Sequence, residues 1–329
     1  MDEIKNLKVN LESKILESNN VVIVPHIGID FDAIGSSIGL GLIVKKLKKV
    51  PYIMIDDLIY EVDHGVQVII EEIKNDFHII NKEKYLQMAN SNDLMLLTDV
   101  NKEKLICLKD TINNESKVII IDHHNEDKDT IKADYKYINC QTSSASEIVT
   151  KLLYLYKIKP TPLIANYLLA GIYLDTNKLT KNVSSETMKI VAYLLELGAS
   201  INSVTDLFTE DFNSDRKVQE LVSKAQIITY SIALILGDEK VEYTKEELAK
   251  AADYLLKYKV DGAFAIGNIG DNIISISARA KDKINVGEIM EKLNGGGNQY
   301  SAATKLENTS VLEVNKKLMK IIKPKYLVD

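Results

Sequence analysis

The sequence has no excess of positive charge and almost no arginine. Of its 329 residues, 41 are Lys or Arg and 47 are Asp or Glu, so the formal net charge is −6 at pH 7. A protein that coats duplex nucleic acid needs a basic surface, so we expect no stable binding to a duplex. The charge does not exclude a small nucleotide held by metal ions. The arginines are Arg216, which we interpret as an exposed helix residue, and Arg279.

Cysteine is scarce, and long apolar runs are absent. Cys107 and Cys140 fit neither a disulfide framework nor a metal-binding spacing, so we interpret them as reduced thiols. The first 20 residues are charged and amphipathic, without the apolar core of a signal peptide. No uninterrupted apolar stretch reaches the roughly 18 residues of a membrane span. We therefore expect a cytoplasmic protein that has no contact with a membrane.

The chain is long enough for two domains that each bury a core. In the first half, β-rich runs alternate with helical patterns, which predicts βαβ units and a mostly parallel sheet. The expected strands are residues 21–25, 52–55, 94–100 and 118–122, and the expected helices include residues 32–49 and 166–175. Ser144 and Glu147 have the spacing of a capping box, which predicts that another helix begins there.

The second half predicts helices followed by a smaller α/β region. Residues 185–228 have a helical pattern, and strand-like runs return after about residue 229. These runs are residues 231–237, 262–270 and 272–280, with helices expected at 246–258 and 286–293. We predict a first domain at residues 1–200, a helical connector at 201–232 and a second domain at 233–329.

The most informative motif is Asp122-His123-His124, which directly follows the apolar run 118–121. It places one carboxylate and two imidazoles at the carboxyl edge of the predicted sheet, where open α/β sheets bind ligands. Two adjacent histidines at the end of a buried strand need neutral or metal-bound partners. The motif therefore indicates a metal site.

A second group of metal-competent side chains follows the first predicted strand. His26, Asp30 and Asp32 would share one side of an extended segment, because positions i, i+4 and i+6 point the same way. One imidazole and two carboxylates suit a divalent ion. The alternative interpretation is a turn in which Asp30 and Asp32 cap the next helix.

Two further aspartates end apolar stretches. Asp99 closes LMLLTD and Asp175 closes LLAGIYLD, and a helix cap explains either residue alone at least as well. Taken together, five acids and three histidines stand at strand or helix ends of one domain. This combination suits two divalent ions about 3.5–4 Å apart, with a shared carboxylate and a bridging hydroxide that attacks phosphorus in line.

The second domain has candidate phosphate-binding groups. The run NGGGN at residues 294–298 has backbone amides that can approach an anion closely, although a flexible turn is the commoner meaning of such a run. Arg279 ends the run ISISAR and can form a forked contact with phosphate, while a surface ion pair explains it equally well. His64 and His78 lie in polar, helical surroundings, and we assign them to structure.

The motifs together resemble those of the DHH phosphoesterase family, in the subgroup with a DHH-associated C-terminal domain. VPHIGIDFDAIGSSIGL resembles the first family motif, LMLLTDV the second, VIIIDHHN the third and LLAGIYLDT the fourth. SISARAKDKINVGEIMEKLNGGGNQYSAAT resembles the signature of the associated domain. The resemblance implies an α/β protein: a DHH domain with a Rossmann-like parallel sheet, joined by a helical connector to a smaller α/β DHH-associated domain, with the substrate cleaved between them.

The resemblance also implies a role for each matching residue. His26 and Asp30 would hold one manganese ion, the other would be held by Asp32, His123 and Asp175, and Asp99 would bridge the two. Asp122 would orient a histidine, and the residues acting in catalysis would be Asp99, His124, facing the substrate phosphate or leaving oxygen, and Arg279. The substrate-binding residues would be Arg279, Gly295, Gly296, Gly297 and Asn298. The family pattern usually has His at the position of Asn298, and Asn cannot carry charge or act as an acid.

Within the family, the stretches SSASEIVTKLL, LLAGIYLDTNKLT and INVGEIMEKLNGGG are most similar to the catalytic part of cyclic di-AMP phosphodiesterases. This similarity implies a phosphodiesterase with two Mn²⁺ ions that converts cyclic di-AMP to pApA and on toward AMP. Mg²⁺, Co²⁺ and Fe²⁺ suit the same ligands. The alternative is an oligoribonuclease (nanoRNase) with adenosine 3′,5′-bisphosphate phosphatase activity, and a non-catalytic nucleotide-binding sensor is a third interpretation. The expected partner is a cyclic or linear dinucleotide or a short RNA, and related proteins are often homodimers.

Overall fold

The computed structural model describes residues 2–55, 62–108, 111, 117–209, 212–229, 231–281, 283–297 and 299–326. The chain divides into two compact units, residues 1–209 and 210–329, each with its own sheet and core. The division falls within the predicted connector, whose first helix, α8 (Ile201–Leu207), belongs to the first unit. The next helix, α9 (Phe212–Ser223), belongs to the second unit. The limits predicted for the two domains stay predictions.

The first unit is built around a parallel sheet, as predicted. Among its described residues the strand order is β3-β2-β1-β4-β5-β6, and every neighbouring pair is parallel. The strands are β1 (Val21–Val24), β2 (Pro51–Met54), β3 (His78–Ile80), β4 (Leu94–Thr98), β5 (Lys117–Asp122) and β6 (Tyr135–Ile138). The edge strands β3 and β6 were not predicted, because they are short and only partly buried. His78 therefore lies in a strand, and the helical surroundings predicted for it are wrong.

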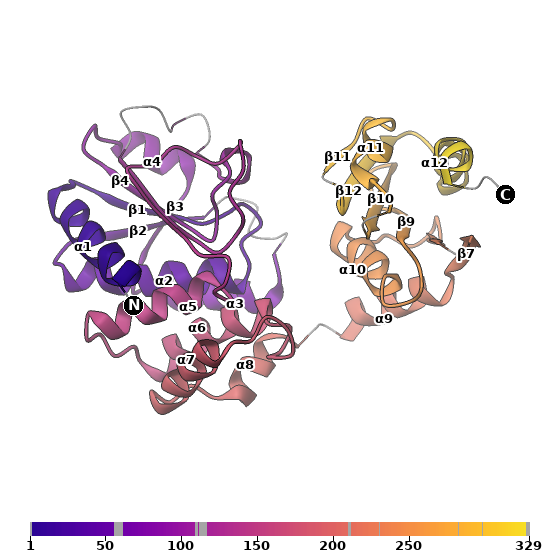
Figure 1. The fold of residues 1–329 in the computed structure, drawn as a ribbon. Coiled ribbons are helices and arrows are strands. Elements are labelled where there is room, and N and C mark those ends of the chain that lie inside the picture. The colour runs from indigo at the N-terminus through magenta and orange to yellow at the C-terminus, as the bar shows by residue number, and fades with distance from the viewer. Residues whose placement is uncertain are drawn as a thin grey trace. The chain divides into compact units, whose positions relative to one another are not determined.

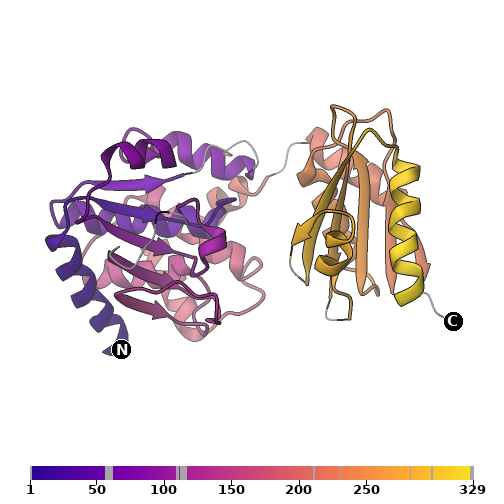
Figure 2. The same cartoon turned by 90° about the horizontal axis from the view of Figure 1, so that it is seen from above.

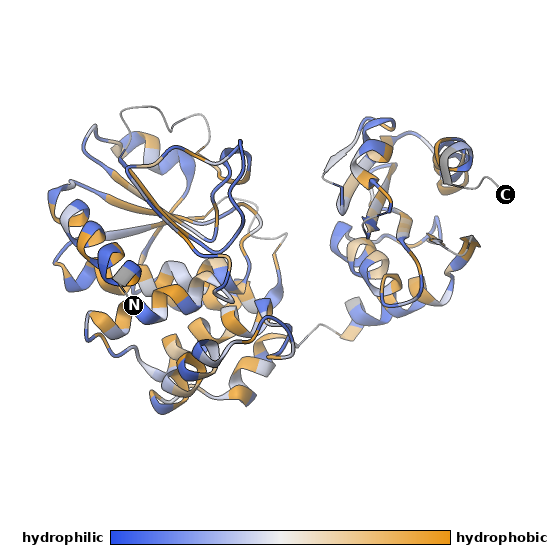
Figure 3. Cartoon of the chain, viewed as in Figure 1, coloured by the Kyte–Doolittle hydropathy of each residue, from blue (hydrophilic) through white to orange (hydrophobic). Residues whose placement is uncertain are grey.

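Helices of the first unit cover both faces of this sheet. They are α1 (Asp2–Glu17), α2 (Phe31–Lys46), α3 (His64–Ile73), α4 (Lys82–Met88), α5 (Ala145–Leu155), α6 (Pro162–Asp175), α7 (Ser185–Glu196) and α8, with a short 3-10 turn at Glu103–Leu105. Val21 and Ile23 of β1 pack in a core with α2, α5 and α6, whereas Val22 and Val24 pack in a second core that includes α4. Figure 1 shows the sheet between these layers, and Figure 3 shows hydrophobic residues through its strands. Because both faces are buried, the strands appear in the sequence as continuous apolar runs.

The helices that border the site begin at polar capping residues. The side chains of Asp30, Ser144 and Thr161 accept backbone N–H groups in the first turns of α2, α5 and α6. A capping side chain satisfies a donor that the helix itself leaves without a partner. Each cap fixes the residue at which its helix begins. The caps of α2 and α5 lie at the edge of the sheet that carries the site.

The second unit is a smaller α/β structure with a mixed sheet. Its described strands follow the order β11-β12-β10-β9-β8-β7, with β8 and β9 parallel and the other pairs antiparallel. They are β7 (Gln226–Thr229), β8 (Ile232–Leu236), β9 (Gly262–Asn268), β10 (Ile273–Ala280), β11 (Gly296–Gly297) and β12 (Ser301–Glu307), and the helices are α9, α10 (Lys245–Leu255), α11 (Val286–Glu291) and α12 (Val311–Tyr326). One face of the sheet packs on α11 and α12 and the other on α9 and α10. Figure 2 shows α12 running along the sheet.

For one helical segment of the second unit, the prediction is wrong at the last residues. The helical pattern was expected to continue through residue 228, but α9 ends at Ser223 and Gln226–Thr229 forms β7, antiparallel to β8. The β-branched residues Ile227, Ile228 and Thr229 favour an extended backbone and oppose continuation of the helix.

In the part of the chain that the structure describes, no single helix has the length and apolar character needed to span a membrane. The bent pair α7 and α8, which meet at 99°, passes that test only when the two helices are taken together.

Candidate metal centre

The candidate site lies where the strand order of the first sheet reverses. The chain leaves β1 toward β2 on one side, and β4 pairs with β1 on the other side. In an open α/β sheet the crevice at the carboxyl ends of two such strands is the usual ligand-binding position. His26 follows β1, Asp99 follows β4, and His123 follows β5, so three predicted residues meet at this edge.

His26, Asp30 and Asp99 form the first group of side chains, which we call the local group. His26 Nε2 lies 3.6 Å from Asp30 Oδ2 and 3.5 Å from Asp99 Oδ2. The other ring nitrogen, Nδ1, lies 2.9 Å from the carbonyl oxygen of Ile27, which can only accept. Nδ1 is therefore the donor, and Nε2 faces the two carboxylates.

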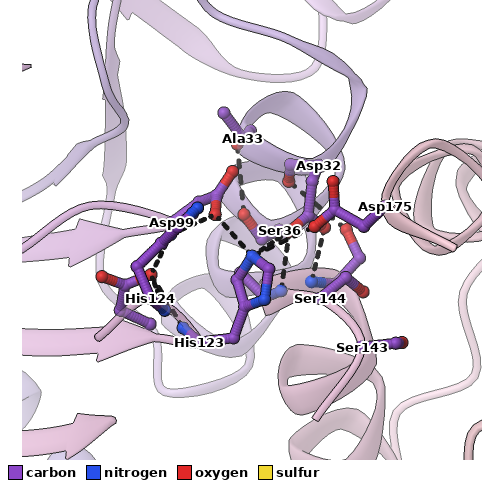
Figure 4. A network of polar contacts seen from close by, with 12 residues as sticks. Asp32, Ala33, Ser36, Asp99, His123, His124, Ser143, Ser144 and Asp175 are labelled. Carbon is purple, nitrogen blue, oxygen red and sulfur yellow. Dashed lines mark hydrogen bonds and ion pairs between the residues drawn. The ribbon is translucent and has the colours of Figure 1, made fainter. Parts of the chain in front are cut away.

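Asp32, His123 and Asp175 form the second group, which we call the long-range group because its members come from α2, the end of β5 and α6. His123 Nε2 lies 3.0 Å from Asp175 Oδ2 and 3.8 Å from Asp32 Oδ2. It also lies 3.3 Å from Asp99 Oδ1, so Asp99 is next to a histidine of each group. Figure 4 shows Asp99, His123, Asp32 and Asp175 converging.

The backbone around Asp30 and Asp32 differs from the prediction. Asp30 is the N-cap of α2, and its Oδ1 accepts from Asp32 N at 2.9 Å and Ala33 N at 3.0 Å. Asp32 already lies in the helix, so His26, Asp30 and Asp32 do not share an extended segment. The helix begins at Phe31 and turns Asp32 toward α5, so Asp32 lies with His123 and Asp175 while Asp30 stays beside His26. Asp30 combines both interpretations, since one oxygen caps the helix and the other faces His26.

The N-terminus of α5 holds the carboxylate of Asp32. Asp32 is fully buried, and its Oδ2 accepts from Ala145 N at 2.7 Å while Oδ1 accepts from Ser146 N at 2.8 Å. Free N–H groups and the helix dipole make this end of a helix favourable for an anion. The sequence marked the start of α5 but did not predict this contact.

The predicted capping box at the start of α5 is half right. Ser144 Oγ accepts from Glu147 N at 3.0 Å, as expected. The carboxylate of Glu147 instead accepts from the backbone and hydroxyl of Ser143 and from Thr187 Oγ1. Glu147 is buried and also pairs with Lys151. The pairing of Glu147 with Thr187 ties this loop to α7.

Asp122 orients the second histidine of the motif. Its Oδ1 accepts from the backbone N–H groups of His123 and His124 and from His124 Nδ1, the last at 2.9 Å. Because Nδ1 is engaged, Nε2 of His124 is the nitrogen available to a substrate. The side chain of His124 is 58% exposed, against 15% for His123. Asn101, a buried residue that the sequence did not single out, donates to the carbonyl of His124.

The neighbouring carboxylates raise the pKa of two histidines of the site. Burial lowers the pKa of His26, but Asp30 and Asp99 outweigh it and raise that pKa to about 11. Burial opposes Asp175 and Asp99 in the same way at His123, where the pKa also rises to about 11. The pKa of the Asp32 carboxyl is raised, first by burial and then by the neighbouring carboxylates. The cluster is therefore an electronegative pocket that attracts positive charge, either protons or cations.

The donor set fits divalent cations. Buried side-chain atoms without a hydrogen-bond partner include Asp99 Oδ1, Asp122 Oδ2 and His123 Nε2, and such atoms are rare unless an ion or a water satisfies them. Two atoms that share an ion 2.0–2.2 Å away lie about 3.0–3.4 Å apart. The separations of 3.0 Å and 3.3 Å around His123 Nε2 fall in this range. That these residues bind an ion, and how many ions, stay predictions.

A hollow of about 640 Å³ opens beside the long-range group. It is large enough for a nucleotide-sized ligand. Its wall contains His123, His124 and Asp175 together with the polar segments 140–143 and 182–184. Strained backbone lies next to it, since Asn177, Lys178 and Leu179 all have positive φ, as Asp99 does. Strain of this kind is concentrated at functional sites.

The predicted substrate-binding residues lie in the second unit. Arg279 Nε pairs with Asp253 Oδ2 at 3.1 Å, and Nη1 donates to Ser277 Oγ and to the carbonyl of Ala278. The ion pair was one of the two interpretations of Arg279, and a role in substrate binding stays a prediction. Asn298 lies outside the described residues.

The three glycines before Asn298 differ in how closely other atoms approach the position of a Cβ. A Cβ at Gly295 would lie 2.3 Å from the carbonyl oxygen of Ala303, and one at Gly297, whose φ is +145°, would lie 2.4 Å from Ser301 O and Ala302 Cα. A Cβ at Gly296 would meet no atom within 4 Å. Packing explains the first and the third glycine and leaves the middle one without a structural reason.

Comparison with known families matches each unit to a different domain. The description "DHH family, N-terminal domain" matches residues 20–172, and "DHHA1 domain" matches residues 224–323. The solved structure of an exopolyphosphatase-related protein from Bacteroides fragilis is similar over 97% of both chains, with a TM-score of 0.73 and 23% identity. At that identity the likeness concerns the fold.

Two curated relatives differ in how much of their length is matched. The cyclic-di-AMP phosphodiesterase GdpP of Geobacillus thermodenitrificans is 32% identical over 320 residues, which is 95% of this chain and 48% of the relative. The chain thus spans about half the length of that protein. The bifunctional oligoribonuclease and PAP phosphatase NrnA of Mycoplasma pneumoniae is 24% identical over 315 residues, which is 92% of both chains.

Proposed function

The chain belongs to the DHH family and carries a DHHA1 domain, and from this premise we propose that it is a metal-dependent hydrolase of phosphodiester bonds. The observation that carries the proposal is the group of buried carboxylate and imidazole atoms without hydrogen-bond partners at the switch point of the sheet. Such atoms are satisfied by a bound ion or water, and the surrounding carboxylates favour a cation.

The protein side chains would hold the cations and position a proton. The residues that would hold them are His26, Asp30, Asp32, Asp99, His123 and Asp175. When bound, the cations would activate a water molecule and neutralise charge that develops on the phosphoryl group. His124 would donate its Nε2 proton to the leaving oxygen, because Asp122 holds Nδ1 and directs the ring outward. Hydrogen bonding to Asp122 raises the pKa of His124, which favours the protonated form needed by an acid.

The substrate that we propose is cyclic di-AMP, opened to pApA and cleaved on toward AMP. Three relatives 30–32% identical over 94–95% of this chain are cyclic-di-AMP phosphodiesterases by name. The hollow beside His123 and His124 has the volume for one nucleotide. The proposed ions are manganese, with the carboxylate and imidazole ligands equally suited to other divalent metals.

The second candidate is cleavage of short RNA together with dephosphorylation of adenosine 3′,5′-bisphosphate. One observation favours it: the relative with that pair of activities is 24% identical to this chain over 315 residues, so it is similar to both units.

A substrate panel separates the two candidates. The purified chain is stripped with EDTA, reloaded with Mn²⁺ or Mg²⁺, and given cyclic di-AMP, pApA, a five-nucleotide RNA or adenosine 3′,5′-bisphosphate, with products separated by chromatography. We expect Mn²⁺-dependent conversion of cyclic di-AMP through pApA, and no turnover by the stripped protein. Cyclic di-AMP left intact while RNA and the bisphosphate are consumed would establish the second candidate instead. No turnover of any substrate with either ion would overturn the proposal.

A further inference from the structure

The contact between α2 and α6 is unusually close beside Asp32. Gly171 of α6 faces this point, and a Cβ built on it would lie 2.6 Å from Asp32 Oδ1, 2.8 Å from Asp32 Cα and 2.4 Å from Ser146 Oγ. Carbon atoms do not approach oxygen or carbon this closely without displacement, because the interior is close-packed. Gly171 therefore occupies a position where only a hydrogen fits in place of a side chain.

The carboxylate of Asp32 is held in one orientation by its hydrogen bonds. It is fully buried, and each oxygen already accepts one amide from the start of α5. The contact of a methyl group at position 171 with Asp32 Oδ1 can be relieved by rotating the carboxylate, which breaks its hydrogen bonds to α5. The contact with Asp32 Cα can be relieved only by moving the backbone of α2 or α6. Either movement displaces the carboxylate of Asp32 from its place.

We propose that Gly171 is a positioning residue for the metal centre: its missing side chain leaves the volume in which Asp32 is held by α5 and aimed at His123 and Asp175. It acts through Asp32 and touches no cation itself. This inference rests on the proposed function, since it assumes that the long-range group binds a cation.

The same helix layer offers a matched control. Gly39 of α2 is also closely packed, and a Cβ there would lie 2.5 Å from Val149 Cγ1 and 3.2 Å from Leu168 Cδ2. These are apolar side-chain atoms of α5 and α6, in the core rather than at the carboxylates. Gly39→Ala therefore adds a methyl group between the same three helices without touching Asp32.

The test is calorimetric titration of Mn²⁺ into the stripped wild-type, Gly171→Ala and Gly39→Ala proteins, with thermal unfolding followed by circular dichroism. We expect both variants to melt below the wild type, and Gly171→Ala alone to bind Mn²⁺ at least about tenfold more weakly, the usual cost of disturbing a group that supports a metal ligand. Equal Mn²⁺ affinities of folded Gly171→Ala and wild type would overturn the inference. An equal loss in Gly39→Ala would also overturn it, by showing that general loosening of the helices is enough. A wild-type protein that binds no Mn²⁺, Mg²⁺, Co²⁺ or Fe²⁺ would instead contradict the proposed function.

A second variant keeps the test open if Gly171→Ala does not fold. Adding Ser146→Ala removes the hydroxyl that lies 2.4 Å from the new methyl group, but the 2.6 Å contact with Asp32 Oδ1 persists. We expect the double variant to fold and to bind Mn²⁺ at least about tenfold more weakly than Ser146→Ala alone. Matching affinities of these two proteins would count against the positioning role.

Discussion

The local and long-range groups contain the same kinds of side chain but are built differently. The local group places His26 and Asp30 four residues apart on one connection, and Asp30 also caps the helix that follows. The long-range group takes Asp32, His123 and Asp175 from three elements, and α5 supplies the amides that fix Asp32. The local group depends on one turn and on Asp99 at the end of the neighbouring strand β4, and the long-range group depends on the packing of several helices.

This difference indicates which changes should separate the two groups. Changes at the β1–α2 connection should weaken the local group alone, and changes in helix packing should weaken the long-range group alone. Asp99 belongs to the local group and also lies next to His123 of the long-range group, and His124 belongs to neither group. Four variants test these statements, and the first, at Asp99, should affect both groups.

Asp99→Asn should have the largest effect, because Asp99 lies within 3.5 Å of a histidine in each group. Asn tolerates the φ of 58° at this position, so the backbone should keep its conformation. We expect Mn²⁺ binding to both groups to be lost and turnover of cyclic di-AMP to fall by more than about 100-fold. This loss would exceed the usual effect of removing a residue that only hydrogen-bonds to a metal ligand. Calorimetry and product chromatography measure these quantities. Asp127→Asn, an exposed aspartate of the same unit, is the control, and near-normal turnover by Asp99→Asn would contradict the bridging role.

His124→Ala should leave Mn²⁺ affinity unchanged and lower kcat for cyclic di-AMP by about 100-fold, as expected when a general acid is removed. The loss should nearly disappear with bis(4-nitrophenyl) phosphate, because its leaving group departs without a proton. His64→Ala, at an exposed histidine at the start of α3, should behave as wild type. Equal losses with both substrates would show that His124 does not protonate the leaving oxygen.

Asp30→Asn should weaken Mn²⁺ binding to the local group by at least about tenfold, since it removes a charge that faces His26. Asn is as good an N-cap as Asp, so the start of the helix should be kept and the melting temperature should fall only through loss of the ion pair with His26. Asp30→Ala should lose the cap as well and reduce the free energy of unfolding by about 1 kcal/mol. Calorimetry with thermal unfolding measures both effects, and a drop in stability without any change in affinity would assign Asp30 to the cap alone.

Gly296→Ala should have the smallest effect on the protein itself, because the new methyl group would meet no atom within 4 Å. We expect the free energy of unfolding to change by less than about 0.5 kcal/mol, and the KM for cyclic di-AMP to rise if the glycine run approaches phosphate. Gly295→Ala, whose Cβ would lie 2.3 Å from Ala303 O, should cost about 1–3 kcal/mol of stability and serves as the contrast. An unchanged KM in Gly296→Ala would remove this glycine from the substrate-binding residues.

The strands that carry the site could be predicted because they are buried on both faces. The runs before His26, Asp99 and His123 are uninterrupted apolar stretches, and each predicted strand overlaps the observed one. The edge strands β3 and β6 have mixed burial and no such run, so the sequence pattern could not reveal them. The convergence of the acids and histidines followed from the rule that parallel strands end at one edge.

Contacts between distant elements could not be predicted in the same way. The hydrogen bonds from Ala145 and Ser146 to Asp32 join residues 113 and 114 positions apart, and backbone amides have no sequence signature of their own. The closeness of Gly171 to Asp32 likewise depends on how α2 and α6 cross. The start of α5 at Ser144 was visible as a capping pattern, but its role in holding a carboxylate was not.

The amides of α5 that hold Asp32 imply an order of events in the life of the protein. His26 and Asp30 are close in the chain, yet Asp32 has its amide partners only once α5 has been synthesised and packed, and its neighbour Gly171 only once α6 has. A cation that needs Asp32, His123 and Asp175 together therefore enters a finished domain. Binding of this cation would then follow folding of the first unit rather than precede it.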